Sequence, residues 1–147
     1  MGDRVGIRPA AASDLATAMS WLSAAGLPSA DLTIAHLSDF LIAVTDGVPI
    51  GMVGIERTGS VGLMRSLVVD PSERSVGVGG RLVSDIEALA KNHGVTELWL
   101  LTIDADGYFS KLRYERRERS KAPVEIQGTQ EFSRLCPGDA VLMSKQL

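Results

Sequence analysis

The segment from residue 61 to residue 93 constrains this chain more than any other, because it joins an apolar strand, a glycine-rich loop and an amphipathic helix. The apolar run Val61–Val69 ends at Asp70-Pro71, and the loop over residues 74–80 leads into the helix. The first N–H groups of a helix have no intrahelical partner, and the positive end of the helix dipole lies at the same place. The segment therefore predicts an anion site, and we expect its ligand to carry phosphate.

Three interpretations of the glycine loop compete. Gly77, Gly79 and Gly80 can form a turn that binds nothing, because glycine serves many tight turns. A dinucleotide fingerprint would need a glycine where this chain has Leu82, and the Gly-Lys-Ser/Thr of a Walker loop does not follow. The pattern Arg/Gln-x-x-Gly-x-Gly fits residues 74–79 in full, with a strand before it and a helix after it. The third interpretation therefore agrees best with the surrounding sequence.

Hydrophobic periodicity along the rest of the chain predicts an α/β fold. The expected strands are Arg4–Arg8, Phe40–Val44, Ile50–Arg57, Val61–Val69, Val95–Ile103 and Ala140–Lys145. The expected helices are Ala12–Ala25, Asp31–His36, the helix after the glycine loop, Asp106–Leu112 and Thr129–Leu135. Asp46-Gly47 has the chemistry of a hairpin turn. The strand, loop, helix and strand from residue 61 to residue 103 predict a βαβ unit, with its ligand near the carboxyl end of the first strand.

The composition restricts the partners and the location that we expect. We expect one domain over residues 1–147. A net charge of −3 and a pI near 5.3 disfavour a nucleic-acid partner. A single cysteine excludes an internal disulfide, and two distant histidines give no metal-ligand spacing. Because no apolar run could span a membrane and the N-terminus lacks a secretory signal, we expect a cytoplasmic protein with no membrane partner.

The loop pattern and the order of elements around it resemble the GNAT superfamily of N-acetyltransferases, which bind acetyl-coenzyme A (acetyl-CoA). The resemblance implies a mixed, mostly antiparallel central sheet, flanked by helices and splayed in a V between its fourth and fifth strands. It implies acetyl-CoA as co-substrate and no metal. Loop amides would hold the pyrophosphate, and the preceding strand would pair with the pantetheine arm. The residues assigned to the coenzyme in this way are Leu67, Val68, Val69, Arg74, Ser75, Val76, Gly77, Val78, Gly79, Gly80 and Arg81.

The last third of the chain narrows the resemblance. Ala122-Pro123, Glu131-Phe132, Leu135-Cys136-Pro137 and Met143 look like the tail of the arsenic-resistance N-acetyltransferases, the ArsN group. The acceptors that this resemblance implies are amino-acid-like arsenicals such as arsinothricin, which is related to the herbicide phosphinothricin. Homodimers are likewise implied by the family alone, because nothing in the residues requires one.

Two departures from the family pattern affect the residues that could carry acid–base chemistry. Many members place a glutamate base on the strand before the loop, but Val61–Val69 contains no acid. Many use a tyrosine acid at the position that is Phe109 here. Acetyl transfer needs a neutral amine and a proton for the thiolate, so Asp104 and Tyr108 are the candidate catalytic residues. The alternatives are a loop or cap carboxylate for Asp104, a core aromatic for Tyr108, and water as the proton donor.

Arg65 is the only charged residue of the strand that precedes the loop. Period two places it on the same face as Leu63 and Leu67, where a charge is costly unless it is paired. One interpretation is a substrate-binding residue that makes a bidentate contact with a carboxylate or arsinate. The other is an ion pair with a neighbouring strand, for instance with Glu56.

The function that we expect is transfer of acetyl from acetyl-CoA to the primary amine of a small amino-acid-like substrate. No activated nucleophile is evident, so the amine would attack directly in a ternary complex. One alternative is a catalytically weak module that senses acyl-CoA or serves as an interaction subunit. Another is an N-acetyltransferase for proteins or peptides. The basic segment Lys111–Lys121 is typical of a solvated face, although it could also contact the 3′-phosphate of the coenzyme.

Overall fold

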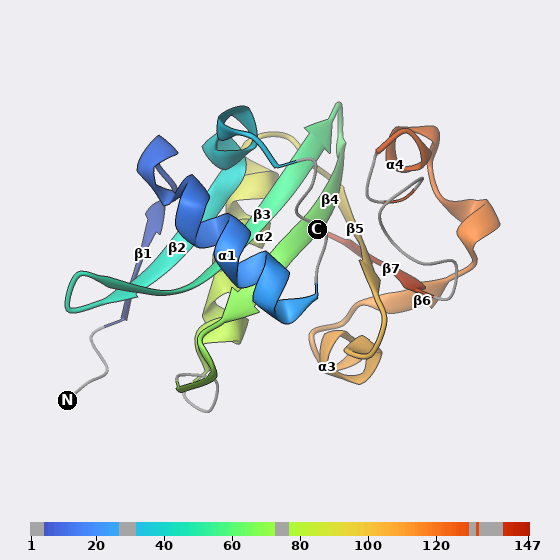
Figure 1. The fold of residues 1–147 in the computed structure, drawn as a ribbon. Coiled ribbons are helices and arrows are strands. Elements are labelled where there is room, and N and C mark those ends of the chain that lie inside the picture. Colours follow the sequence, from blue (N-terminus) through green and yellow to red (C-terminus); the bar gives the residue numbers. More distant parts are fainter. Residues whose placement is uncertain (1–4, 27–31, 73–76, 130–131, 133–139) are drawn as a thin grey trace.

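The computed structural model describes residues 5–26, 32–72, 77–129, 132 and 140–147. Within these residues, seven strands form one mixed sheet in the order β1-β2-β3-β4-β5-β7-β6 (Figure 1). The strands are β1 (Val5–Pro9), β2 (Phe40–Thr45), β3 (Val48–Thr58), β4 (Val61–Val69), β5 (Glu97–Thr102), β6 (Glu115–Arg117) and β7 (Val141–Gln146). All pairings are antiparallel except that of β4 with β5, which is parallel.

Helices cover both faces of this sheet. The α-helices are α1 (Leu15–Ala25), α2 (Val78–Asn92), α3 (Asp106–Lys111) and α4 (Val124–Gln127), and the 3₁₀ segments are η1 (Ala12–Asp14), η2 (Ile34–Asp39) and η4 (Arg119–Lys121). In Figure 1, α1 crosses in front of the strands and α2 lies behind them. The long helix α2 follows β4 and precedes β5, which confirms the predicted βαβ unit.

The β2–β3 hairpin forms where the turn chemistry predicted it. Asp46 and Gly47 both have positive φ, 51° and 78°, which is the conformation of a two-residue type I′ turn. Thr45 pairs with Val48 directly across this turn. The predicted strands over residues 40–44 and 61–69 are confirmed, and the latter has the predicted bounds.

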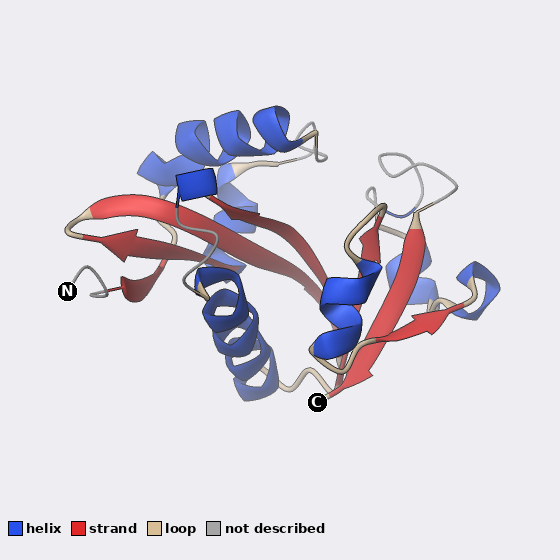
Figure 2. Cartoon of the chain, turned by 90° about the horizontal axis from the view of Figure 1, so that it is seen from below, coloured by secondary structure: helices blue, strands red, loops and turns tan. Residues whose placement is uncertain are grey.

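The sheet splays between β4 and β5. Their bridge pairs are Val61 with Glu97, Gly62 with Leu98 and Leu63 with Trp99, whereas β4 stays paired with β3 as far as Val69. Figure 2 shows the sheet dividing into two arms at this point, one formed by β1–β4 and the other by β5–β7. The predicted fold class, a GNAT-like sheet that opens between its fourth and fifth strands, is therefore confirmed.

A β-bulge at Ser66 changes which residues of β4 share a face. Ser66 has a φ of 64°, and the register between β3 and β4 shifts between Met52 and Gly54. Leu63 packs beneath α4, whereas Leu67 packs into the cluster beneath α2. The expectation that Leu67 shares a face with Arg65 and Leu63 is therefore wrong, because period-two alternation fails across the extra residue.

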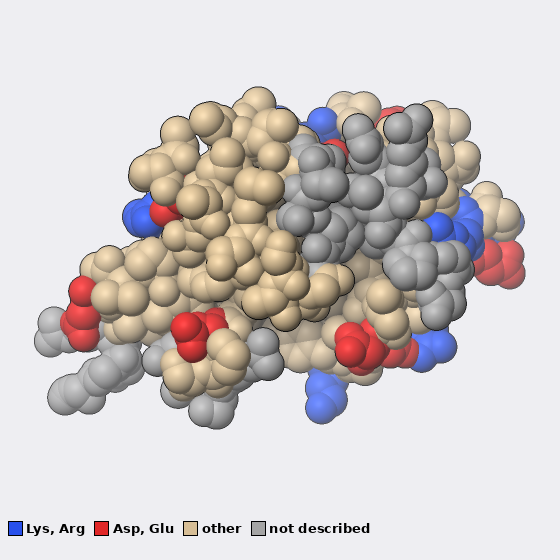
Figure 3. All heavy atoms as spheres, viewed as in Figure 1, with Lys and Arg blue, Asp and Glu red and all other residues tan. Residues whose placement is uncertain are grey.

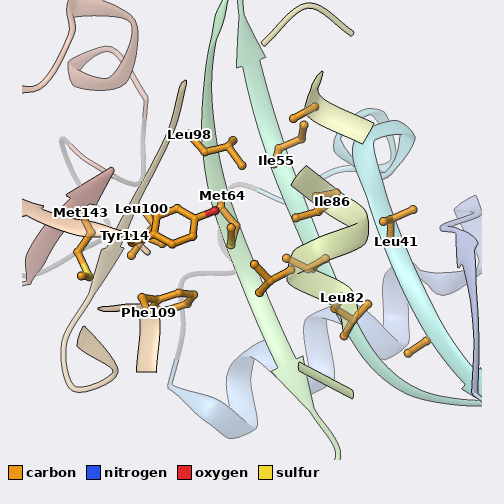
Figure 4. Packing of buried hydrophobic residues seen from close by; sticks show 14 of the residues in the cluster. Leu41, Ile55, Met64, Leu82, Ile86, Leu98, Leu100, Phe109, Tyr114 and Met143 are labelled. Carbon is orange, nitrogen blue, oxygen red and sulfur yellow. The ribbon is translucent and has the colours of Figure 1, made fainter. Parts of the chain in front are cut away.

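Three apolar clusters build the core. The largest lies between α2 and the sheet, and it extends under α3 to Phe109, Tyr114 and Met143 (Figure 4). The second lies beneath α1 and includes Phe40 and Met52. The third lies beneath α4. The clusters under α1 and α4 occupy the same face of the sheet, on either side of the splayed part of β4.

Several predicted elements differ from those observed. The expected helix at residues 31–36 is, in its described part, the 3₁₀ segment η2, which continues to Asp39. The expected helix Thr129–Leu135 lies mostly outside the described residues. The periodicity did not predict β6 or α4, which have only three and four residues. Within the described residues, no helix is long and apolar enough to span a membrane, and no three His, Cys, Asp or Glu side chains form a metal-binding group.

Candidate functional site

The first turn of α2 presents backbone amides beside the carboxyl end of β4. Gly77 caps the helix in the left-handed conformation, with a φ of 79°. The Arg81 amide makes the first intrahelical bond, 3.2 Å to the Gly77 carbonyl. The amides of residues 78–80 come before this bond, where the first N–H groups of a helix are available, so they are suited to bind an anion. The predicted loop residues Arg74, Ser75 and Val76 lie outside the described residues.

Close packing holds this helix start in place. Leu82 is fully buried, and its Cδ1 would lie only 3.1 Å from a Cβ added at Gly51 of β3. The lack of a side chain at Gly51 therefore lets the first turn of α2 approach the sheet. The Arg81 guanidinium donates to the Val5 carbonyl at 2.6 Å, which ties the same turn to β1. The Arg81 side chain thus has a structural contact, and its amide is used within the helix.

Tyr108 of α3 reaches across to this turn from the other arm of the sheet. A Cβ added at Gly79 would lie 2.9 Å from the Tyr108 hydroxyl and 3.7 Å from Val69 Cγ2. Tyr108 is 41% exposed as a residue, and its ring meets the Phe109 ring edge-on, with 5.3 Å between centroids. Partial burial raises the pKa of the Tyr108 phenol, so the hydroxyl keeps its proton at neutral pH. The lack of a side chain at Gly79 thus leaves room for this hydroxyl.

The other residues after β5 have different environments. Asp104 is exposed in the turn before α3, and the Ala105 amide donates instead to Thr102 Oγ1 at 3.0 Å. Phe109, at the family's tyrosine position, is 7% exposed and packs against the Tyr114 ring. A hydroxyl is therefore absent at the usual position, and Tyr108 presents one from the adjacent residue.

Arg65 and Glu56 form an ion pair on the face that carries α1 and α4. The Arg65 side chain is 0% exposed, and its Nη1 lies 2.8 Å from Glu56 Oε2. Its Nε donates to Ser66 Oγ at 3.0 Å. Of the two interpretations of Arg65, the ion pair with Glu56 is thus observed. Burial of the guanidinium strengthens this pair, since little water competes for the cation.

A surface pocket adjoins this ion pair. It has a volume of about 250 Å³ and is lined by Ala35, His36, Asp39, Ile55, Glu56 and Arg57. From the residues alone, Glu56 is expected only as a partner for Arg65, because nothing in their spacing predicts that η2 lies beside β3. The pocket therefore adds a polar entrance on this face that the residues alone did not indicate.

A second polar network joins α2 to the other arm. The Tyr114 hydroxyl donates to Glu87 Oε2 at 2.8 Å, and Lys145 Nζ lies 3.0 Å from the same oxygen. Burial, reinforced by Glu87, raises the pKa of Tyr114 far above its ordinary value. The Tyr114 ring packs among Leu100, Phe109 and Met143 (Figure 4). This network was not predicted, because its members lie far apart in the sequence.

Comparison with known proteins agrees with this geometry. Residues 12–117 match the model of the acetyltransferase (GNAT) family. An uncharacterised N-acetyltransferase of Chlorobaculum tepidum is 33% identical over 99 residues, which cover 67% of this chain and 63% of that protein. The match thus spans less than two thirds of this curated relative.

Solved structures share the fold at low identity. N-acetylglutamate synthase of Neisseria gonorrhoeae, complexed with coenzyme A and N-acetyl-glutamate, has a TM-score of 0.82 at 22% identity, covering 97% of this chain and 35% of that chain. Rv2747 of Mycobacterium tuberculosis, in complex with CoA, has a TM-score of 0.80 at 17% identity, and the match covers 97% of this chain and 99% of that chain. Because the family model matches residues 12–117 and the splayed sheet agrees with it, this chain belongs to the GNAT family of acetyltransferases.

Proposed function

We propose that this chain is an acetyl-CoA-dependent N-acetyltransferase whose acceptor is the primary amine of a small amino-acid-like compound. The observation that carries the proposal is the splay of β4 from β5 directly beside the amides that begin α2. An extended arm can pair with a strand edge while a phosphate binds a helix start, and the two features lie together here.

The coenzyme would follow β4 toward α2. The amides of Val78, Gly79 and Gly80 are suited to the diphosphate, and the motif adds Arg74, Ser75 and Val76 to this loop. The pantetheine arm would lie along Leu67–Val69, beyond the last bridge to β5. Two structural neighbours are complexes with coenzyme A, which supports the same use of the fold in this chain.

The acceptor would approach from the face that carries α1 and α4. Arg65 lies on this face, and its guanidinium has the fork geometry that suits a carboxylate or an arsinate. A neighbouring fold in complex with N-acetyl-glutamate supports an amino-acid-like acceptor. The tail residues support the finer proposal that arsinothricin or phosphinothricin is accepted. In Figure 3 the described atoms of this face belong mainly to uncharged residues, which favours a small acceptor over a basic peptide.

The chemistry would be direct attack in a ternary complex. The neutral amine nitrogen bonds to the thioester carbonyl carbon, and the C–S bond breaks. The nitrogen loses a proton as the amide forms, and the sulfur leaves as a thiolate that needs a proton. Tyr108 is the proton donor that we favour, because its hydroxyl is protonated and lies beside Gly79, in the first turn of α2. Asp104 is the second candidate and lies exposed in the turn after β5. Positioning of the two substrates would supply much of the rate.

Calorimetry and a thiol-release assay test the proposal. We expect the purified chain to bind acetyl-CoA and to release coenzyme A when L-glutamate or phosphinothricin is added, with the N-acetyl product identified by mass spectrometry. Binding of acetyl-CoA without turnover on any small amine or peptide would favour the sensor instead. Turnover on peptides alone would favour a protein N-acetyltransferase. No binding of acetyl-CoA would exclude all three.

A further inference from the structure

β4 contains no acidic residue, but the neighbouring strand β3 carries one, Glu56, on the same part of the sheet. It lies on β3 opposite Leu63 in the antiparallel register, and Arg65 is the next residue of β4 on the same face. Cross-strand neighbours on one face of a sheet have Cβ atoms about 5 Å apart. The Glu56 carboxylate can therefore reach the region that an acidic side chain on β4 would reach. The bulge at Ser66 follows directly, where β4 leaves β5.

The contacts of Glu56 leave part of its carboxylate available. Its Oε2 accepts the hydrogen bond from Arg65 Nη1 at 2.8 Å. Within the described part of the chain, Oε1 has no hydrogen-bond partner. The side chain is 21% exposed, although the guanidinium that it contacts is fully buried. Glu56 therefore connects a buried cation on the acceptor face with the solvent.

The solvent side of Glu56 is the pocket of about 250 Å³ beside η2. The other charged or titratable groups that line it are Asp39 and Arg57, which pair with each other at 3.0 and 3.3 Å, and His36. The His36 ring is held by the Thr33 amide, which donates to Nδ1 at 3.0 Å. Asp39 is thus occupied by a two-bond contact, and Glu56 is the carboxylate of this pocket with an uncommitted oxygen in the described structure.

We infer that Glu56 is the general base of the reaction, and that the pocket beside it carries the released proton to solvent. This inference rests on the proposed function. The ionised carboxylate attracts the acceptor's ammonium group and takes its proton, directly or through one water. The free amine then attacks the thioester carbonyl, and the N–C bond forms as the C–S bond breaks. The nitrogen loses its second proton to solvent as the amide forms, and the thiolate takes a proton from Tyr108 or from water. Arg65 positions the carboxylate and contributes the positive charge that an α-carboxylate needs beside it.

Rate–pH profiles of the wild type and of Glu56→Gln test this role with L-glutamate and phosphinothricin as acceptors. Glutamine keeps the shape and one acceptor oxygen but cannot take a proton. We expect kcat to fall about 100-fold or more while the Kd for acetyl-CoA is unchanged, because general bases contribute about 10²–10⁴-fold. The residual rate should rise about tenfold per pH unit through neutrality, because only the free amine then reacts, whereas the wild-type rate levels off.

Hydroxylamine separates a base from a merely structural residue, because it is already a free base at neutral pH. With hydroxylamine as acceptor, we expect Glu56→Gln to lose much less activity than with L-glutamate. Glu56→Asp, which retains a carboxylate, should keep the wild-type shape of the profile. The matched control is Glu97→Gln on β5, which removes a half-buried carboxylate that accepts a bond from Trp99 Nε1 at 2.7 Å and no other among the described residues. It should retain the wild-type rate and profile.

A Glu56→Gln enzyme with the wild-type rate and profile would overturn the inference, as would equal losses with hydroxylamine and L-glutamate. If Glu56→Gln does not fold, loss of the wild-type profile in a folded Glu56→Asp enzyme has the same meaning. These outcomes are distinct from failure of the proposed function, which would appear as a wild-type chain that turns over no amine.

Discussion

Gly54 of β3 is a residue at which one methyl group would disturb the core. A Cβ added there would overlap the ring of Phe40, which is fully buried beneath α1. We expect Gly54→Ala to lower the free energy of unfolding by about 3 kcal/mol, because the ring has no room to move. Urea denaturation measures this loss. Gly6→Ala on β1 is the matched control, since its Cβ would meet Val44 Cγ2 at an ordinary 3.7 Å and should change stability little. Equal effects would contradict the packing argument.

Arg65 is predicted to select acceptors that carry an acidic group. We expect Arg65→Lys to raise the KM for L-glutamate about tenfold, because lysine keeps the charge but loses the planar fork. The KM for acetyl-CoA should not change. An amine without a carboxylate, such as ethanolamine, is the control acceptor, and its kcat/KM should be nearly unaffected. A similar loss on both acceptors would show that Arg65 acts only through its ion pair with Glu56.

At this scale, the sequence indicated residue types better than their surroundings. It allowed two interpretations of Arg65, a substrate-binding residue or an ion pair with Glu56. The β3–β4 register brings Arg65 and Glu56 close enough to form the ion pair. Leu67 was placed on the wrong face because the bulge at Ser66 leaves no mark in the residue pattern. The approach of Tyr108 to Gly79 depends on how far the two arms of the sheet diverge, which no local pattern encodes.

At the scale of elements, length decided what could be predicted. β4 and the helix after the glycine loop are long, and their apolar periods are strong enough to fix both type and position. β6 and α4 have only three and four residues, which are too few for a periodic pattern to stand out, so their neighbours hold them in place instead. Arg117 of β6, for example, lies 5.6 Å from the centre of the Trp99 ring.

The start of α1 depends on one buried carboxylate. Asp14 is 7% exposed, accepts two bonds from Arg8 at 2.9 and 3.1 Å, and accepts the Ala11 amide at 2.7 Å. These hydrogen bonds hold the pKa of Asp14 below its ordinary value, and those from Arg8 have the largest effect. We expect Asp14→Ala to lower the free energy of unfolding by about 1–2 kcal/mol at neutral pH, a modest figure because Arg8 is partly exposed.

The same carboxylate should make stability depend on pH in the acid range. Because the folded pKa of Asp14 is lowered, its contribution is full above the ordinary aspartate pKa of 3.8 and is lost as pH falls through the folded value. The difference between wild type and Asp14→Ala, measured by urea denaturation, should therefore shrink below about pH 4. A difference that stayed constant down to the lowest accessible pH would contradict this role for the charge.

At the scale of the whole molecule, two arms must hold a coenzyme between them although little backbone joins them. β4 and β5 share bridge pairs at three positions, Val61, Gly62 and Leu63 with their partners. The larger connection is the cluster beneath α2, which continues from β4 across β5 to β7 (Figure 4). The Tyr114–Glu87–Lys145 network adds a polar connection within it, from the middle of α2 to β7 and the segment after α3.

Removing the Tyr114 hydroxyl should weaken this connection between the arms. Tyr114→Phe keeps the packed ring but deprives Glu87 of a 2.8 Å bond, so we expect the free energy of unfolding to fall by about 1–2 kcal/mol at pH 8. Because burial keeps the folded phenol neutral far above its ordinary pKa of 10.0, the wild type should lose this advantage as pH rises above about 10, where the unfolded tyrosine ionises. Urea denaturation at pH 8 and about pH 11 measures both effects.

If the network also sets the spacing of the two arms, Tyr114→Phe should weaken acetyl-CoA binding in calorimetry. An unchanged Kd for acetyl-CoA would restrict the role of the Tyr114 hydroxyl to stability.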